Sequence, residues 1–175
     1  RAFAEEQAAW GADGMWCGDC LASSKLISPA LHRRMAFDAN VELIAALKSR
    51  GQSVFYEPAD DDPGFMRIYA EEGIDAINVG IALDIVEGKR ALDGRAGALG
   101  NLDAIRFLQH ATPEATAAEV ERIVTAGKAG GGYAFCTDSI PRDATEENMR
   151  AMAETVRRCG RYERKSAKGG SARCG

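Results

Sequence analysis

Ala96-Gly97-Ala98-Leu99-Gly100-Asn101-Leu102-Asp103 joins a short apolar run to the start of a helix-like segment. An amide and a carboxylate at the mouth of a strand-to-helix turn stand where α/β proteins build their active sites. Further along the chain, a second strand-like run over 130–135 precedes Ser139-Ile140-Pro141 and a helix start at Thr145. The two segments are typical of successive units of one architecture.

Apolar runs and helix-like segments alternate in this way over most of the chain. The expected strands are Gly14–Cys17, Ser53–Tyr56, Ala76–Val79, Ala96–Leu99 and Tyr133–Phe135. Because strands that alternate with helices form parallel βαβ units, the pattern predicts an α/β fold. Two architectures suit it, an open doubly wound sheet and part of an eight-stranded (β/α)8 TIM barrel. No glycine-rich nucleotide fingerprint follows the first strand, so the nucleotide-binding form of the open sheet is not indicated.

Caps, prolines and glycines mark where the helices begin and end. A long helix is predicted from Ser28-Pro29 to Gly51 and another from Thr112-Pro113 to Gly127, since a hydroxyl cap before proline is typical of a helix start. The other helices are predicted over Ala2–Trp10, Phe65–Glu72, Leu83–Leu92, Leu102–Leu108 and from Thr145 onward. In the last of these helices, Met149 and Met152 are expected to be packing residues.

Length and composition are those of an ordinary globular protein. The chain has 175 residues, 46% of them hydrophobic and 27% charged, which suffices for one domain over residues 1–162. Residues 163–175 carry charge and glycine without an apolar face, which predicts a disordered tail.

The formal charge of −4 is spread along the chain, so nucleic acid is not an expected partner. No apolar run approaches the roughly 20 residues of a membrane span and no signal peptide opens the chain, so we expect a cytoplasmic protein.

The five cysteines do not form the pattern of a disulfide framework. Cys17-Gly18-Asp19-Cys20 has the C-x-x-C spacing of a redox pair or of half a zinc site. A zinc site needs a second such pair, and a redox pair should open a helix, whereas this one ends a predicted strand. We therefore favour two incidental thiols near a pocket.

Short motifs in a specific order resemble the C-terminal part of the uroporphyrinogen decarboxylase superfamily, from Gly11 to Tyr162. The matching pieces are 14–19 with Leu26-Ile27-Ser28-Pro29, Gly73-Ile74-Asp75-Ala76-Ile77-Asn78, Gly100-Asn101-Leu102-Asp103, Thr112-Pro113-Glu114, Gly131-Gly132-Tyr133, Ile140-Pro141, Glu147-Asn148 and Gly160-Arg161-Tyr162. The resemblance implies a TIM barrel whose pocket opens at the C-terminal ends of its strands. This chain would supply about five C-terminal βα units. The absence of an initial methionine is typical of a cut end, so the missing N-terminal half of the barrel is an expected partner.

Two chemistries occur in that superfamily. The decarboxylases act without metal on a tetrapyrrole that carries many carboxylates, and they usually have Gly-His-Gly after the last strand. Here Cys136-Thr137-Asp138-Ser139 stands in that place, without histidine. The other branch transfers methyl groups between a corrinoid protein and an acceptor, and its zinc ligands usually come from His-x-Cys-Gly and a later Cys. Those positions hold Glu57-Pro58-Ala59-Asp60 and Asp138.

An altered metal site at these positions is chemically possible. Glu57, Asp138 and Cys136 are the candidate ligands, with Asp60 and Asp61 nearby, because oxygen and sulfur donors can hold zinc or a harder cation. The alternative is that the acidic residues are solvated loop carboxylates, and the run 60–62 before Pro63 favours a helix start by itself.

Side chains at the strand ends are the other site candidates. Asp19 and Glu57 are expected to be catalytic, since each ends a strand and would face the pocket mouth. Asn78, Asn101 and Asp103 are expected to bind substrate. The alternatives are a turn-forming role for Asp19, a backbone partner for Asn78 and helix capping for Asn101 and Asp103.

Other conspicuous residues are expected to have structural roles. His32 and His110 are away from the predicted strand ends and are interpreted as surface residues. Trp16 and Phe55 are interpreted as core residues.

A corrinoid-linked methyltransferase is the leading hypothesis for function, with a small methylated substrate or acceptor, a corrinoid protein as partner and zinc as a possible cofactor. Its basis is the missing decarboxylase histidine together with the run Ser139-Ile140-Pro141 and Thr145-Glu146-Glu147-Asn148. The alternatives are an enzyme that decarboxylates uroporphyrinogen, a binding protein without catalysis, and a barrel fragment that is inactive by itself. The last follows because five strands cannot close an eight-stranded barrel.

Overall fold

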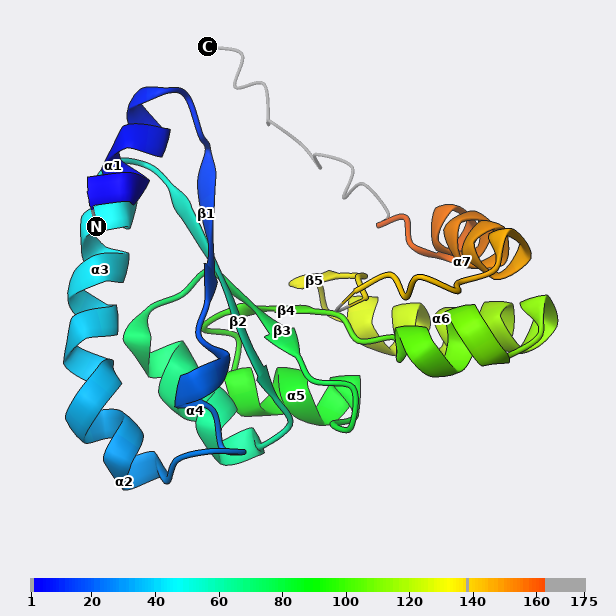
Figure 1. Cartoon of the computed structure of the whole chain (residues 1–175), viewed down its shortest axis with the longest axis horizontal. Coiled ribbons are helices and arrows are strands. Elements are labelled where there is room, and N and C mark those ends of the chain that lie inside the picture. The colour runs from blue at the N-terminus through cyan, green and yellow to red at the C-terminus, as the bar shows by residue number, and fades with distance from the viewer. Residues whose placement is uncertain (1, 138, 163–175) are drawn as a thin grey trace, which may run out of the picture.

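One parallel sheet organises the chain, in a computed structural model that describes residues 2–137 and 139–162. Its strands lie in the order β1-β2-β3-β4-β5, and each neighbouring pair is parallel (Figure 1). They are β1 (Gly14–Gly18), β2 (Ser53–Asp60), β3 (Ala76–Val79), β4 (Gly97–Leu99) and β5 (Tyr133–Ala134). A doubly wound sheet reverses its strand order at a switch point, whereas a barrel keeps the order of the chain. The fold is therefore α/β, with the topology of a partial TIM barrel.

Helices follow the strands, as the sequence predicts. They are α1 (Ala2–Ala9), η1 (Cys20–Ala22), α2 (Pro29–His32), η2 (Arg33–Phe37), α3 (Asp38–Lys48), α4 (Pro63–Glu72), α5 (Ile85–Leu92), η3 (Ile105–His110), α6 (Pro113–Lys128) and α7 (Glu146–Cys159). The long helix predicted from Ser28 to Gly51 is divided by the π-helical turn η2 into α2 and α3. The helix predicted from Leu102 begins only at Ile105, because Leu102 forms a β-bridge with Thr137.

Side-chain caps fix several helix starts. The hydroxyls of Ser28, Thr112 and Thr145 accept the backbone N–H groups of Leu31, Ala115 and Asn148. Asp62 caps α4 and Asp84 caps α5 in the same manner. The predicted starts at Ser28-Pro29, Thr112-Pro113 and Thr145 are thus confirmed, and each cap supplies an acceptor to an N–H group that the helix leaves unpaired.

The hydrophobic core lies between the sheet and its helices. Val54 and Tyr56 of β2 are buried against α3 and α4, together with Ile77 of β3 and Tyr69 of α4. In Figure 1, α3, α4 and α5 lie on one side of strands β1 to β3. None of the helices in the described ranges is long and apolar enough to cross a membrane.

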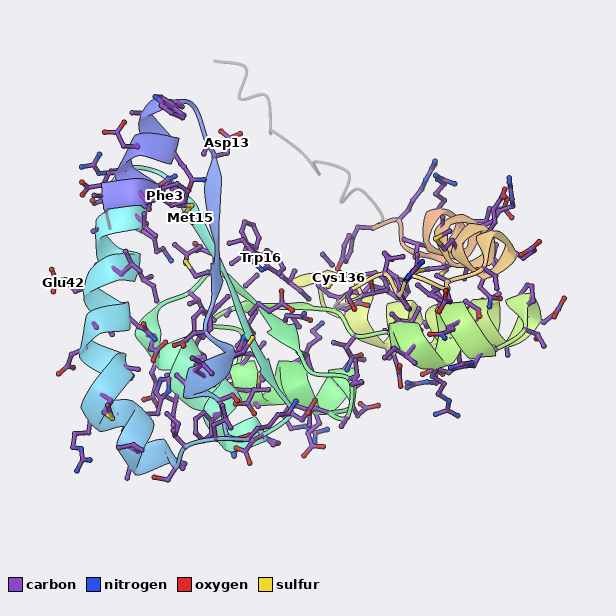
Figure 2. The ribbon with its side chains drawn as sticks, viewed as in Figure 1. Phe3, Asp13, Met15, Trp16, Glu42 and Cys136 are labelled. Atoms are coloured by element: carbon purple, nitrogen blue, oxygen red, sulfur yellow. The ribbon has the colours of Figure 1, made fainter. Side chains whose placement is uncertain are left out.

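Alternate residues of each strand point to the face of the sheet opposite α3, α4 and α5, and no helix of the described residues forms a layer over this face beside β1 to β3 (Figure 1). Trp16 pairs in register with Phe55, and Gly18 pairs with Glu57, so these residues share one face. We call it the inner face. Trp16 is 53% exposed there, so its assignment to the core is wrong, while Phe55 is half-buried. Figure 2 shows Trp16 extending from β1 away from α3.

Candidate active site at the strand ends

Glu57, near the C-terminal end of β2, is the centre of a hydrogen-bonded group on the inner face. The Trp16 indole N–H donates to its Oε2 at 2.9 Å, and the Asn78 amide donates to its Oε1 at 2.8 Å. Three neighbouring strands therefore fix one half-buried carboxylate. This position at the C-terminal ends of parallel strands is the one predicted for the pocket.

A hollow of about 110 Å³ lies beside this carboxylate. Its walls are formed by Lys25, Glu57, Asn78, Val79, Gly80, Ile81 and Asn101. Glu57, Asn78 and Asn101, which were predicted as site residues from three different strand ends, are therefore brought together. The Asn101 amide donates to the carbonyls of Gly80 and Leu83 at 2.9 and 2.6 Å, so it also holds the loop that follows β3.

Asp103 lies outside this group. Its carboxylate accepts the backbone N–H of Arg106 at 2.9 Å, which is the capping role given as the alternative. It borders a different hollow of about 240 Å³ that Asn101, Arg106 and Arg122 also line. No contact links Asp103 to Glu57 in the described ranges, so a role in substrate binding stays a prediction.

Asp19 is not part of the hollow at Glu57. The Tyr56 hydroxyl donates to its carboxylate at 2.8 Å, and Tyr56 is buried between the sheet and the helices. The reason is the alternation of side chains along a strand, because Gly18 is in register with Glu57 and the next residue points to the other face. The expected position of Asp19 at the pocket mouth therefore needs correction, and its catalytic role is an untested prediction.

The candidate metal ligands are only partly assembled. The Cys136 thiol lies 3.9 Å from Asn78 Oδ1, so the Asn78 amide connects this thiol to Glu57. Asp138, the third predicted ligand, lies outside the described residues. Within those residues no group of three His, Cys, Asp or Glu side chains could hold a metal ion. Tetrahedral zinc needs three or four protein donors, so the described residues do not by themselves form such a site.

The C-x-x-C pair has the features of incidental thiols. Cys17 and Cys20 are both free, and burial raises the pKa of the Cys17 thiol. A reactive cysteine needs a lowered pKa, which Cys17 lacks, and the interpretation of the pair as incidental thiols stays a prediction.

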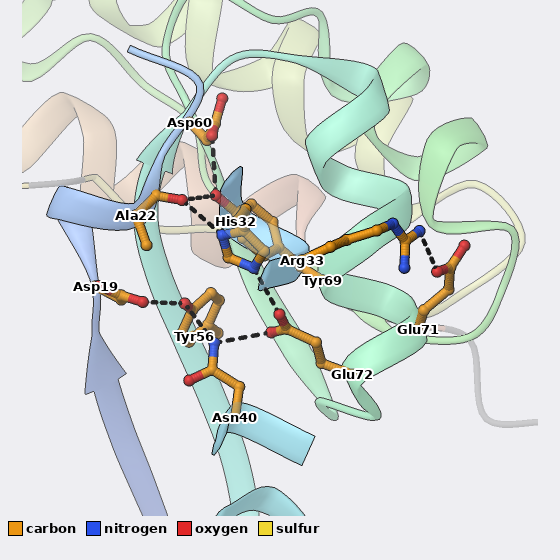
Figure 3. A network of polar contacts seen from close by, with 10 residues as sticks. All are labelled: Asp19, Ala22, His32, Arg33, Asn40, Tyr56, Asp60, Tyr69, Glu71 and Glu72. Carbon is orange, nitrogen blue, oxygen red and sulfur yellow. Dashed lines mark hydrogen bonds and ion pairs between the residues drawn. The ribbon is translucent and has the colours of Figure 1, made fainter. Parts of the chain in front are cut away.

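A polar network behind the sheet fixes the segment that follows β1 (Figure 3). Asp60, which is fully buried, accepts the Ser24 backbone N–H at 2.7 Å and the Tyr69 hydroxyl at 2.9 Å. The interpretation of the acidic run 60–62 as solvated loop carboxylates is wrong for Asp60. Burial of a carboxylate is costly unless donors surround it, and here Ser24 and Tyr69 supply them.

His32 is fully buried at the centre of this network, so its assignment to the surface is wrong, whereas His110 is exposed as predicted. Its Nδ1 lies 2.9 Å from the Ala22 carbonyl, and its Nε2 lies 2.7 Å from Glu72 Oε1. A carbonyl only accepts, so Nδ1 carries hydrogen, and one more proton lies between Nε2 and Glu72. The Asn40 amide donates to the other Glu72 oxygen at 3.2 Å.

The network residues Asn40, Tyr56, Tyr69 and Glu72 were not singled out from the sequence. Burial raises the pKa of both tyrosines far above its ordinary value, and neighbouring Asp19 and Asp60 add to the effect. The hydroxyls therefore stay protonated and donate. A signal was present in α4, where Phe65, Tyr69 and Glu72 have the spacing of one helix face and would place Glu72 among apolar residues.

The buried carboxyl group of Glu72 should make the free energy of unfolding depend on pH. Burial raises the pKa of Glu72 above its ordinary 4.5, although His32 and Asn40 oppose the shift. The folded state thus holds this proton more tightly than the unfolded state, so the contribution of Glu72 is complete below pH 4.5 and is lost as pH rises through the folded pKa. We expect the unfolding free energy of wild type, relative to Glu72→Gln, to fall as pH rises above 4.5 in urea titrations.

Glu71→Gln is the matched control, because Glu71 is the exposed neighbour that pairs with Arg33 at 2.6 Å. The difference between wild type and this control should change little over the same pH range. A wild-type stability that rises with pH relative to Glu72→Gln would contradict the assignment.

Comparison with known proteins agrees with the barrel topology. The family model for uroporphyrinogen decarboxylase (URO-D) matches residues 1–159. No curated protein matches the sequence. Among solved structures, a methyltransferase from Methanosarcina mazei is similar with a TM-score of 0.76 and 17% sequence identity, over 90% of this chain. The similarity spans 45% of that protein, so the present chain covers less than half its length.

At this low identity the structural similarity shows the fold alone, while the family model matches most of the sequence. The parallel strand order and the polar residues at the C-terminal strand ends agree with that match. The chain therefore belongs to the uroporphyrinogen decarboxylase (URO-D) family.

Proposed function

We propose that the inner face is part of the pocket of a methyltransferase, which moves a methyl group between a small methylated substrate or acceptor and a corrinoid carried by a partner protein. The structurally similar protein from Methanosarcina mazei is a methyltransferase, which supports this branch of the family. Family membership by itself leaves decarboxylation as the alternative, so the residues of the pocket must favour one chemistry.

The charge of the hollow at Glu57 is the observation that carries the proposal. Among its described lining residues the one cation is Lys25, whose ammonium lies 3.0 Å from Asp61 Oδ2. The other polar groups are the Glu57 carboxylate and the amides of Asn78 and Asn101. A substrate with many carboxylates requires arginines or lysines around it, because carboxylates are bound by charge-assisted hydrogen bonds. The arginine-rich segment of the decarboxylases would lie outside this chain, so the lack of further cations concerns only the part of the pocket that the described residues form, and that part suits a small neutral or cationic group.

Exposed apolar side chains on the loops beyond the strands support a protein partner. Leu21 and Leu26 follow β1 and are 78% and 63% exposed, while Ile81 follows β3 and Ile140 follows β5. Apolar side chains gathered around a polar site are typical of interaction surfaces. We propose that the corrinoid-carrying protein approaches the pocket from this side.

Glu57 is the residue that we expect to act on substrate. Its carboxylate is held between Trp16 and Asn78, so its position is fixed before substrate binds. Positioned charge of this kind stabilises a reacting group without reorganisation during the reaction.

Methyl transfer can be tested with the full-length protein and methylcobalamin. The expected result is a change in the visible spectrum of the corrinoid when a thiol acceptor or a small methyl donor is added, with formation of the methylated or demethylated product. Metal analysis of the same preparation tests the zinc prediction separately. Absence of any methyl exchange, together with release of carbon dioxide from uroporphyrinogen, would establish the decarboxylase instead.

A further inference from the structure

We infer that the ligand of the inner face is a methylated ammonium ion, which lies against Trp16 and is neutralised by Glu57. The inference rests on the proposed function, because it names the substrate class of the same pocket. An aromatic face next to a carboxylate is the arrangement that binds such cations, by attraction to the ring quadrupole and by charge.

Trp16 presents an aromatic surface that its neighbours hold in place. One side of its ring packs on Phe55, with the ring centroids 6.2 Å apart and the planes inclined by 17°. The indole N–H is occupied by Glu57 Oε2. An indole with its N–H bonded and half its surface exposed is free to contact a ligand through its ring.

Glu57 supplies an unbalanced negative charge next to this ring. Its two oxygens accept N–H groups from Trp16 and Asn78, which are neutral. In the described ranges no ion pair joins it to Lys, Arg or His, although Lys25, whose ammonium lies 3.0 Å from Asp61 Oδ2, lines the same hollow. A half-buried carboxylate gains from a cation in direct contact with it, which a cationic ligand would supply.

The remaining walls favour methyl groups on that cation. Val79 and Ile81 line the hollow of about 110 Å³ beside Glu57, and Phe55 lies behind Trp16. The side chains of Val79, Ile81 and Phe55 offer contact to methyl groups, and the Glu57 oxygens beside them already accept N–H groups from Trp16 and Asn78. A methylated ammonium therefore fits better than a primary ammonium, whose three N–H donors each need an acceptor.

Binding to the full-length protein tests the inference by calorimetry with choline as the probe. Its uncharged analogue, in which carbon replaces the nitrogen, is the ligand control. We expect choline to bind at least about tenfold more tightly than the analogue. Trp16→Leu and Glu57→Gln should each weaken choline binding by about tenfold, and Trp16→Phe by less, since phenylalanine keeps an aromatic face.

Trp10→Leu is the matched protein control, because Trp10 is 85% exposed at the end of α1 and has no part in the site. Circular dichroism identifies any variant that fails to fold. If Trp16→Leu fails to fold, choline binding is compared between wild type and Trp16→Phe. Equal binding of choline and its analogue, unchanged binding by Trp16→Leu and Glu57→Gln, or no binding of choline would each overturn the inference.

The methylcobalamin assay separates this inference from the proposed function. Methyl transfer from neutral donors alone, without choline binding, would leave the proposed function standing and refute the ammonium ligand. Choline binding that depends on Trp16 and Glu57 in a protein without any methyl transfer would support the ammonium ligand and refute the proposed function.

Discussion

Replacing His32 with alanine should lower the free energy of unfolding by about 3–5 kcal/mol, the range found when one partner of a buried ion pair is removed. Both side chains of the pair with Glu72 are fully buried, and 2.7 Å separates Nε2 from Oε1. The substitution leaves the Glu72 carboxylate without its proton-sharing partner and removes the imidazole N–H from the Ala22 carbonyl, which keeps only the longer contact of 3.3 Å with the Tyr69 hydroxyl. Urea denaturation of the full-length protein, followed by circular dichroism, measures the change.

His110→Ala is the control for this substitution, because His110 is exposed and should cost no more than about 0.5 kcal/mol. The double variant His32→Leu with Glu72→Met should recover much of the loss, since apolar residues of similar volume often replace a buried pair without cost. A loss for His32→Ala as small as that for His110→Ala would show that the pair does not stabilise the fold.

Regular structure was predictable because its causes are local. Each of the five strands was expected within a few residues of where it lies, since apolar runs bounded by glycine and helix caps are marked in the sequence itself. The starts at Ser28 and Thr112 follow from a hydroxyl before proline, which needs no tertiary contact to act. The π-helical turn after His32 has no such marker, and the predicted helix therefore lacked it.

The faces of the side chains were harder to predict, since they depend on register. Trp16 and Asp19 are three residues apart, yet Trp16 lies on the inner face and Asp19 on the helix side. A short continuous apolar run such as 14–17 is typical of a strand buried on both faces, so the sequence favours a core position for Trp16. Only the pairing of Trp16 with Phe55 shows which face it occupies.

Contacts between distant parts of the chain were the least predictable. His32 and Glu72 are separated by 40 residues, and the histidine alone has no feature of a buried residue. The pair of His32 and Glu72 also affects the candidate active site. The hydrogen-bonded network around the pair holds Asp19 through Tyr56 and Ser24 through Asp60. The segment after β1 is thereby anchored next to Lys25, which lines the hollow at Glu57.

Glu57→Ala should reduce kcat/KM for methyl transfer by about 100- to 1,000-fold, the range typical of removing a positioned group that acts on the reacting atoms. The carboxylate is the one negative charge among the described residues of its hollow, and its loss also frees the indole of Trp16 and the amide of Asn78. Asn78→Ala should cost only about tenfold, because it removes one support and leaves the charge. Initial rates of corrinoid demethylation measure each effect.

Asp103→Ala distinguishes a role of Glu57 in the reaction from a general effect of losing a carboxylate at a strand end. Asp103 follows β4, and Glu57 lies near the C-terminal end of β2, but Asp103 accepts a backbone N–H of its own loop and lies outside the hollow at Glu57. Its loss should cost about 1 kcal/mol of stability, as for other helix caps, and, since Asp103 is predicted to bind substrate, should act on KM and leave kcat within about threefold of wild type. If Glu57→Ala behaved like Asp103→Ala, the reaction would have to be assigned to groups other than the carboxylate at the end of β2.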